Sequence, residues 1–229
     1  MFALLIGLVA ASLLAAQQDD ASVLRSAGSP RDFELSTDPT SEPWAKAPGV
    51  LASHNYLGEP IDGRPTEIRS RWTRDHLYLL YICPYDELNL KPDPVMSAET
   101  PRLWNWDVAE AFIGSAVGPI TRYREFQVSP QGEWVDLDID RENPKGQGGG
   151  KWNSGFTVAA RIDPQARIWY GVMKIPFASI DDRPAEKGRT LRAGLYRIAG
   201  AAPRIYYAWR PTGQTSFHVP QAFGTIRLE

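Results

Sequence analysis

The chain has 229 residues, of which 43% are hydrophobic, so it can bury a sizeable core in one large domain or two small ones. This composition excludes a chain that is mostly disordered. The 25 Lys and Arg residues nearly balance the 27 Asp and Glu residues. A surface without net positive charge argues against nucleic acid or an anionic membrane as the main partner.

The first 16 residues have the pattern of a secretory signal peptide. An apolar run over 2–14 is too short to span a bilayer comfortably, and small residues at Ala15 and Ala16 precede a polar stretch. We therefore expect cleavage near Ala16 and a secreted or periplasmic protein, with no transmembrane segment in the mature chain. The alternative is a short membrane anchor, because no positive charge precedes the apolar run.

Residues 17–48 are rich in Asp, Ser, Thr and Pro and predict an extended lead-in to one domain over 49–229. Within that domain, short β-branched and aromatic segments alternate with turn residues, and 146–150 is expected to be a flexible loop. The segments with this strand pattern are 66–72, 76–83, 107–113, 122–129, 133–139, 156–162, 167–175, 191–199, 205–209 and 224–228. Only 176–180 suggests a helical turn, begun by Pro176. The pattern predicts an all-β fold: a single jelly-roll-like β-sandwich with one short helical turn.

Cys83 is the only cysteine, so no intrachain disulfide can stabilise the fold. It lies in an apolar, alternating segment, and no histidine partner is apparent nearby. A buried, unreactive thiol is therefore expected.

Eight Trp residues are more than packing usually requires in a chain of this size. Trp72, Trp134 and Trp169 lie in alternating segments and are expected to pack in the core. Trp104 and Trp106 instead precede a strand, so at least one indole is expected to project from a loop. Sugar rings stack their C–H faces on aromatic rings and hydrogen-bond through their hydroxyls. An exposed indole beside carboxyl and amide groups therefore favours a carbohydrate site.

Several segments, in order along the chain, resemble family 9 carbohydrate-binding modules. The matching segments are 104–113, 123–130, 171–177, 208–212 and 216–224. The resemblance covers about 66–229, the range of the predicted strands. It implies non-catalytic binding of an oligo- or polysaccharide, with two aromatic side chains clamping a terminal sugar and polar side chains binding its hydroxyls.

Carried over position by position, the resemblance makes Trp104 one wall of the clamp and Phe217 the other, where the family has Trp. Glu110 matches the acidic ligand-binding residue of the family. Gln127 stands where the family often has a basic residue, and Gln214 is the nearby amide. These departures leave the sugar unassigned, because a smaller ring and an uncharged amide bind differently. The alternative places Glu110 on a solvated edge strand and Phe217 in the core under a loop.

Asp136, Asp138 and Asp140 alternate, so they share one strand face and, with Glu142, could offer oxygen ligands to Ca²⁺. The resemblance also implies structural calcium, since the family contains such sites. The alternative is a solvated acidic strand face, and no other cofactor is expected.

Three further functions stay open. A glycoside hydrolase could use Asp107 and Glu110, although side chains three apart in a strand point to opposite faces. Related β-sandwiches can hold b-type haem, for which Met173 and His218 are the available axial ligands. For His218 a hydrogen bond within a loop is the simpler expectation. The last alternative is a domain that binds a non-sugar partner at the cell envelope.

Overall fold

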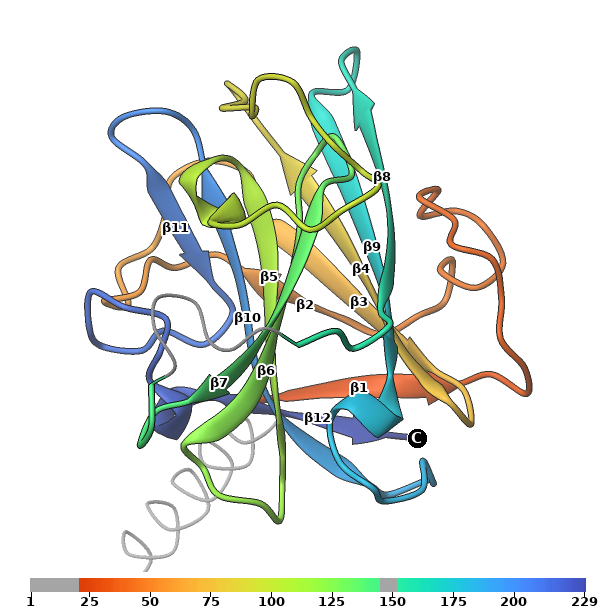
Figure 1. Cartoon of the computed structure of the whole chain (residues 1–229). Coiled ribbons are helices and arrows are strands. Elements are labelled where there is room, and N and C mark those ends of the chain that lie inside the picture. The colour runs from red at the N-terminus through yellow and green to blue at the C-terminus, as the bar shows by residue number, and fades with distance from the viewer. Residues whose placement is uncertain (1–20, 145–151) are drawn as a thin grey trace, which may run out of the picture.

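The computed structural model describes residues 21–144 and 152–229, and the predicted signal peptide and the 146–150 loop lie outside this part. The described residues form strands and three single-turn 3₁₀ helices, with no helix long and apolar enough to cross a membrane (Figure 1). The elements are β1 (Val23–Gly28), β2 (Gly49–Ala52), β3 (Thr66–Trp72), β4 (His76–Pro84), η1 (Leu103–Asn105), β5 (Val108–Ser115), β6 (Arg122–Val128), β7 (Trp134–Asp140), β8 (Thr157–Asp163), β9 (Ile168–Pro176), η2 (Phe177–Ser179), β10 (Thr190–Ala199), β11 (Ile205–Ala208), η3 (Pro220–Ala222) and β12 (Gly224–Leu228). The all-β prediction is confirmed, and the predicted helical turn is η2.

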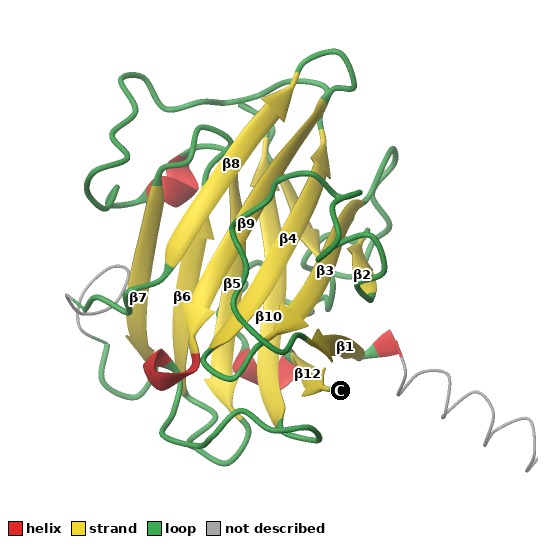
Figure 2. Cartoon of the chain, turned by 90° about the vertical axis from the view of Figure 1, so that its right-hand side faces the viewer, coloured by secondary structure: helices red, strands yellow, loops and turns green. Residues whose placement is uncertain are grey.

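The strands form one continuous sheet in the order β7-β6-β5-β10-β12-β1-β3-β4-β9-β8, with β11 beside β10 and β2 beside β3. The sheet folds over itself into two layers. The first layer contains β5, β6 and β10, and the second layer, made of β3, β4, β9 and β8, covers it (Figure 2). Strand β1 joins the two layers, because it pairs in parallel first with β12 and then with β3. The result is the predicted β-sandwich.

The central core lies between the two layers and follows from the alternation of side chains along each strand. On β5, for example, Ala109, Ala111 and Ile113 point into this core. Trp169 is fully buried there, while Trp72 and Trp134 pack against it with part of each ring exposed. Core packing of these three tryptophans, predicted from the sequence, is therefore confirmed.

Cys83 is a free, buried thiol in the central core, as predicted. Burial raises the pKa of its thiol to about 12. The thiolate form is therefore scarce near neutral pH, which makes the sulfur a poor nucleophile.

The lead-in segment is an integral part of the fold. No strand was predicted before residue 66, but β1 and β2 lie there. Both were missed because they are short and contain Ser, Gly and Ala instead of a β-branched run. After β1 the chain crosses the outer face of the second layer, where Trp44 is fully buried against Tyr78 and Leu80 of β4.

Asp32 fastens this crossing segment to the sheet. Its carboxylate lies 2.8 Å from both His76 Nδ1 and Lys174 Nζ and accepts a 2.6 Å hydrogen bond from Thr73. Burial alone would raise the pKa of Asp32, but the hydrogen bonds from Lys174, Thr73 and His76 outweigh it and hold the pKa well below its usual range. The ionised carboxylate therefore stabilises the folded state.

Replacing Asp32 by asparagine is expected to lower the free energy of unfolding at pH 7 by about 1 kcal/mol, a small value because the group is partly exposed. Since the folded pKa lies below the unfolded one, this contribution is complete above about pH 4 and shrinks as the pH falls further. Thermal unfolding at pH 7 and at pH 3 checks this, with the exposed Asp75→Asn as control. An equal difference at both pH values would contradict it.

Candidate functional site

The candidate site lies on the outer face of the first layer, opposite the central core. Glu110 and Phe112 of β5 point to this face, since they alternate with the core residues of the strand. Glu110 lies opposite Gln127 of β6 on one side and Tyr196 of β10 on the other. Strand β5 is thus interior to the sheet, and Glu110 is only 3% exposed, so it does not sit on a solvated edge strand.

A pocket of about 480 Å³ opens on this face, a volume in the usual range for small-molecule sites. Its lining combines aromatic rings with carboxyl and guanidinium groups from the sheet, the η1 turn and the loop after β11. The lining residues are Trp104, Asn105, Glu110, Phe112, Glu125, Ile198, Arg204, Tyr206, Phe217 and His218.

Trp104 forms part of the pocket wall from the η1 turn, and its ring is partly buried against the aromatic cluster of this face. Arg204, between β10 and β11, holds the turn in place. Its guanidinium donates one hydrogen bond to the carbonyl oxygen of Trp104 and another to that of Trp106, each 2.5 Å long. Because a guanidinium is planar and forked, these two bonds fix the turn in both position and orientation.

Phe217 also lines the pocket, although only 7% of its surface is exposed. Its ring stacks on Tyr196, with centroids 4.0 Å apart and planes 7° apart. Tyr56 and Tyr206 approach it edge-on. Phe217 is therefore a packed ring of the outer face and a pocket wall at the same time.

Two buried carboxyl groups and one amide lie at the base of the pocket. The side-chain nitrogen of Gln127 donates to Glu110, at 2.8 Å, and also to Glu125. Burial, followed by the nearby charge of Glu125, raises the pKa of Glu110 well above its usual range. Burial likewise raises the pKa of Glu125 to about 8. In the empty pocket at neutral pH the pair therefore retains protons that exposed carboxyl groups would lose.

His218 makes the loop hydrogen bond that was predicted. Its Nδ1 lies 2.7 Å from the hydroxyl of Tyr123, and its ring is 4.9 Å from that of Phe112. Burial, and then the positive charge of Arg141, lowers the pKa of His218 to about 4. The imidazole is therefore uncharged at neutral pH.

The structure brings together Trp104, Glu110 and Phe217 at one pocket. Gln127 is fully buried and reaches that pocket only through its hydrogen bonds to the two carboxyl groups. Gln214 is exposed in the loop after β11 and does not line the pocket.

Glu125, Arg204 and Tyr206 also line the pocket and were not among the residues predicted from the sequence. A signal for Glu125 was present, because it lies two positions before Gln127 in the same strand and must share its face. Arg204 has no such signal, since its hydrogen bonds to the η1 turn span about 100 residues of sequence.

The three calcium candidates share one face of β7, but each has its own protein partner. Asp140 pairs with Arg122 at 3.1 Å and Asp138 pairs with Arg124. Asp136 accepts a 2.7 Å hydrogen bond from the backbone of Ser154. Within 21–144 and 152–229, no group of three or more His, Cys, Asp or Glu residues is placed to hold a metal ion. The described residues therefore do not assemble the predicted calcium ligands.

The residues of the two alternative chemistries do not converge. Met173 lies in the central core, whereas His218 packs on the outer face of the first layer, so the sheet separates the two haem-ligand candidates. Asp107 is fully buried, accepts a 2.7 Å hydrogen bond from the backbone of Gly200 and does not line the pocket with Glu110.

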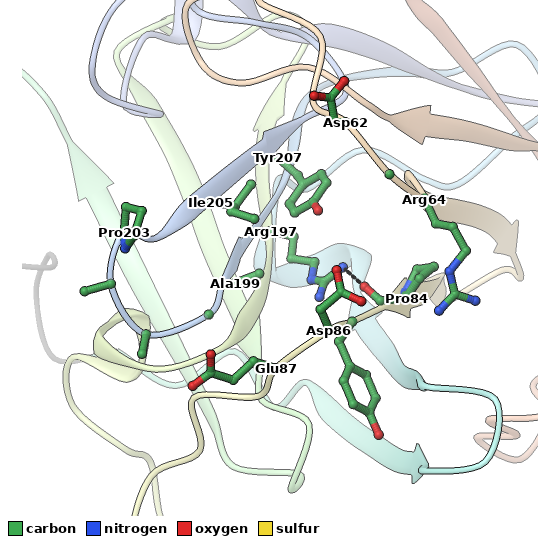
Figure 3. A pocket seen from close by; sticks show the side chains of 15 residues that line it. Asp62, Arg64, Pro84, Asp86, Glu87, Arg197, Ala199, Pro203, Ile205 and Tyr207 are labelled. Atoms are coloured by element: carbon green, nitrogen blue, oxygen red, sulfur yellow. Dashed lines mark hydrogen bonds between the residues drawn. The ribbon is translucent and has the colours of Figure 1, made fainter.

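A second cavity, of about 270 Å³, lies at one end of the sandwich near the β10–β11 turn (Figure 3). Arg197 projects into it and donates a 2.7 Å hydrogen bond to the carbonyl oxygen of Pro84, with Asp86 drawn nearby. Arg197 is 1% exposed, and its guanidinium carbon lies 5.1 Å from the centre of the Tyr207 ring. It thereby ties β10 to the end of β4. No indole lines this cavity, so it is the weaker candidate for a sugar site.

No protein-family model and no curated protein matches the chain. Solved structures do match it. A candidate carbohydrate-binding protein from Bacteroides uniformis superposes with a TM-score of 0.69 at 17% identity, over 90% of this chain and 99% of the other. A family 9 carbohydrate-binding module from Caldicellulosiruptor kristjanssonii in complex with cellotriose matches with a TM-score of 0.64 at 10% identity, over 90% of this chain and 93% of the other. The chain has the fold of these modules.

A family 9 module from the same organism in complex with glucose matches with a TM-score of 0.63 at 11% identity, over 90% of this chain and 95% of that one. The family 9 resemblance first noted in the sequence is thus confirmed at the level of the fold. At 10% to 17% identity the likeness is one of fold alone.

Proposed function

We propose that this chain binds carbohydrate without catalysing its cleavage, holding a terminal sugar in the pocket lined by Trp104 and Phe217. The observation that carries the proposal is an indole from a surface turn and a buried carboxyl group, Glu110, in the lining of one pocket. An indole offers a flat apolar face for the C–H groups of a pyranose. A carboxyl group offers strong hydrogen-bond acceptors for its hydroxyls.

The other residues have supporting roles in this proposal. Phe217 supplies the second aromatic wall, with one face of its ring supported by Tyr196. Gln127 orients Glu110 from below through its 2.8 Å hydrogen bond. The similar structures support the ligand class, because family 9 modules from Caldicellulosiruptor kristjanssonii were solved with cellotriose and with glucose.

The arrangement of the carboxyl groups argues against hydrolysis. In a glycosidase, two carboxyl groups flank the scissile bond, one as acid and the other as base or nucleophile. Here Glu110 and Glu125 both lie at the base of the pocket and accept hydrogen bonds from the same Gln127 nitrogen. A glycosidic bond in the pocket would meet both carboxyl groups from one side.

We further propose that the protein is secreted or periplasmic and meets its polysaccharide outside the cytoplasm, in the context of polysaccharide breakdown. The support is the signal-peptide pattern over 1–16. Mass spectrometry of the exported protein should give an N-terminus near Gln17. An intact Met1 in that protein would contradict cleavage.

A glycan array with the purified protein tests the binding proposal. Binding of a defined set of oligosaccharides, with no sugar released on long incubation, is the expected result. Released reducing sugar would show catalysis instead. An array with no bound glycan at high protein concentration would overturn the proposal and favour a non-sugar partner.

Replacing Arg204 by alanine is expected to weaken binding of the sugar found on the array about tenfold, because the turn that carries Trp104 loses two charge-assisted hydrogen bonds. Arg204→Lys should restore only part of the affinity, since an ammonium group cannot hold both carbonyl groups with the same geometry. Titration calorimetry measures both, with the exposed Arg227→Ala as control. Unchanged affinity in Arg204→Ala would show that these two hydrogen bonds are not needed to position the turn.

A further inference from the structure

The pocket is lined by two carboxyl groups but by only one guanidinium group. Glu110 and Glu125 are 3% and 2% exposed, and both belong to its lining. Arg204 is the single Lys or Arg among those lining residues, and its guanidinium already donates to three backbone carbonyl groups. Two buried carboxyl groups therefore face one committed cation.

One carboxyl oxygen of the Glu110–Glu125 pair is buried without any hydrogen bond. Among the described residues, Glu125 Oε2 is buried and has no hydrogen-bond partner. The imidazole Nε2 of His218 lies 3.9 Å from it, beyond hydrogen-bond range, and that ring is uncharged at neutral pH. Its carboxyl group keeps a proton near neutral pH, and once that proton leaves, this oxygen is a buried acceptor without a donor, which is costly. It therefore marks a place for a donor that the protein does not supply.

The remaining titratable groups around the pair do not supply a positive charge to it. The phenols of Tyr123 and Tyr196 face the pair from β6 and β10, and burial raises the pKa of both, so they stay neutral. Arg141, after β7, acts on Tyr123 and His218 but is itself exposed and outside the pocket lining. When the pocket is empty, the missing positive charge is supplied by bound protons.

A ligand with an ammonium group would supply both the missing charge and the missing donor. Such a group has three N–H donors and one full positive charge, whereas a neutral sugar hydroxyl has one donor and no charge. We infer that the pocket selects an amino sugar with a free, protonated amino group, such as glucosamine or the end of a glucosamine oligomer, over the corresponding neutral sugar. This inference rests on the proposed function, since it assigns the charge of the sugar that the same pocket holds.

Binding of the amino sugar replaces a proton of the carboxyl pair by an ammonium group. Below the pKa of the amine, the ligand enters as an ammonium ion, the carboxyl pair gives up a proton to the solvent, and a carboxylate–ammonium pair remains. Binding of the amino sugar therefore releases up to about one proton and tightens as the pH rises toward neutrality. Binding of glucose leaves the proton in place.

Calorimetric titration of glucosamine, N-acetylglucosamine and glucose at pH 6.5, in two buffers with different ionisation enthalpies, tests the inference. Glucosamine should bind about tenfold or more tightly than the other two, with close to one proton released. Glucose and N-acetylglucosamine should release about none. Glu125→Gln should reduce the preference for glucosamine to about threefold or less, because the amide cannot carry the charge.

The outcomes separate this inference from the proposed function. If glucose binds as tightly as glucosamine, or glucosamine binds without releasing a proton, the charge assignment is overturned while carbohydrate binding stands. A glucosamine preference that survives in Glu125→Gln also overturns it. If no sugar binds in the titrations or on the array, the proposed function fails first. Proton release is measured on the unaltered chain, so this test does not depend on the folding of the variant.

Discussion

The Trp104→Ala variant is expected to bind sugar at least about tenfold more weakly than the unaltered chain, a loss of about 1.4 kcal/mol. The indole supplies the flat wall on which a pyranose would stack, and alanine offers no such surface. Thermal stability should change little, by a few degrees at most by the usual scaling. The ring is only partly buried and sits in a surface turn, so its removal widens an open pocket instead of creating a sealed cavity.

Trp106→Ala is the matched control for this experiment. Trp106 is also a partly buried indole of the same cluster, two positions further along, but it does not line the pocket. Its variant should keep affinity within about threefold, since it removes no stacking surface from the ligand. Equal losses in both variants, or a large fall in the melting temperature of Trp104→Ala alone, would assign Trp104 to packing.

Glu125→Gln is expected to stabilise the protein at pH 8 by up to roughly 4 kcal/mol, or several degrees in melting temperature. Burial raises the pKa of Glu125 to about 8 in the folded state, whereas the unfolded chain has an ordinary carboxyl pKa. At a pH between these two pKa values, the unfolded chain has lost a proton that the folded chain keeps. The free energy of unfolding therefore falls as the pH rises. A neutral amide at this position removes that dependence.

Thermal unfolding at pH 5 and pH 8 measures the effect. At pH 5 the folded carboxyl group is protonated, and the variant should match the unaltered chain closely. The exposed Glu142→Gln serves as control and should behave alike at both pH values. A variant that is less stable at pH 8 would show that the ionised carboxylate is well compensated in the folded state, which would also remove the basis for selecting a cationic sugar.

The ten strands from residue 66 on could be predicted because their side chains alternate between an apolar core and a second face, and because turn residues separate them. The same reasoning missed β1, whose short, weakly apolar sequence is placed by pairing with β12 and β3 at distant positions in the chain. Burial of Trp44 was missed for a related reason, since it packs on β4 from a segment without regular structure.

The candidate site was predictable only in part. Trp104, Glu110 and Phe217 were chosen from the family resemblance, and the fold brings them to the lining of one pocket. Gln214 was placed by its closeness to Phe217 in the sequence, yet the loop leaves its side chain exposed and outside that pocket. Arg204 reaches the η1 turn only because β10 and β11 bring it there. Closeness along the chain does not predict such contacts.

The most direct test of the account is a crystal structure of the protein with the best-binding glycan from the array. We expect one sugar ring stacked on the indole of Trp104, with a polar group of that ring hydrogen-bonded to Glu110. A glycan bound elsewhere, for example at the cavity beside Arg197, with the Trp104 pocket empty, would contradict it.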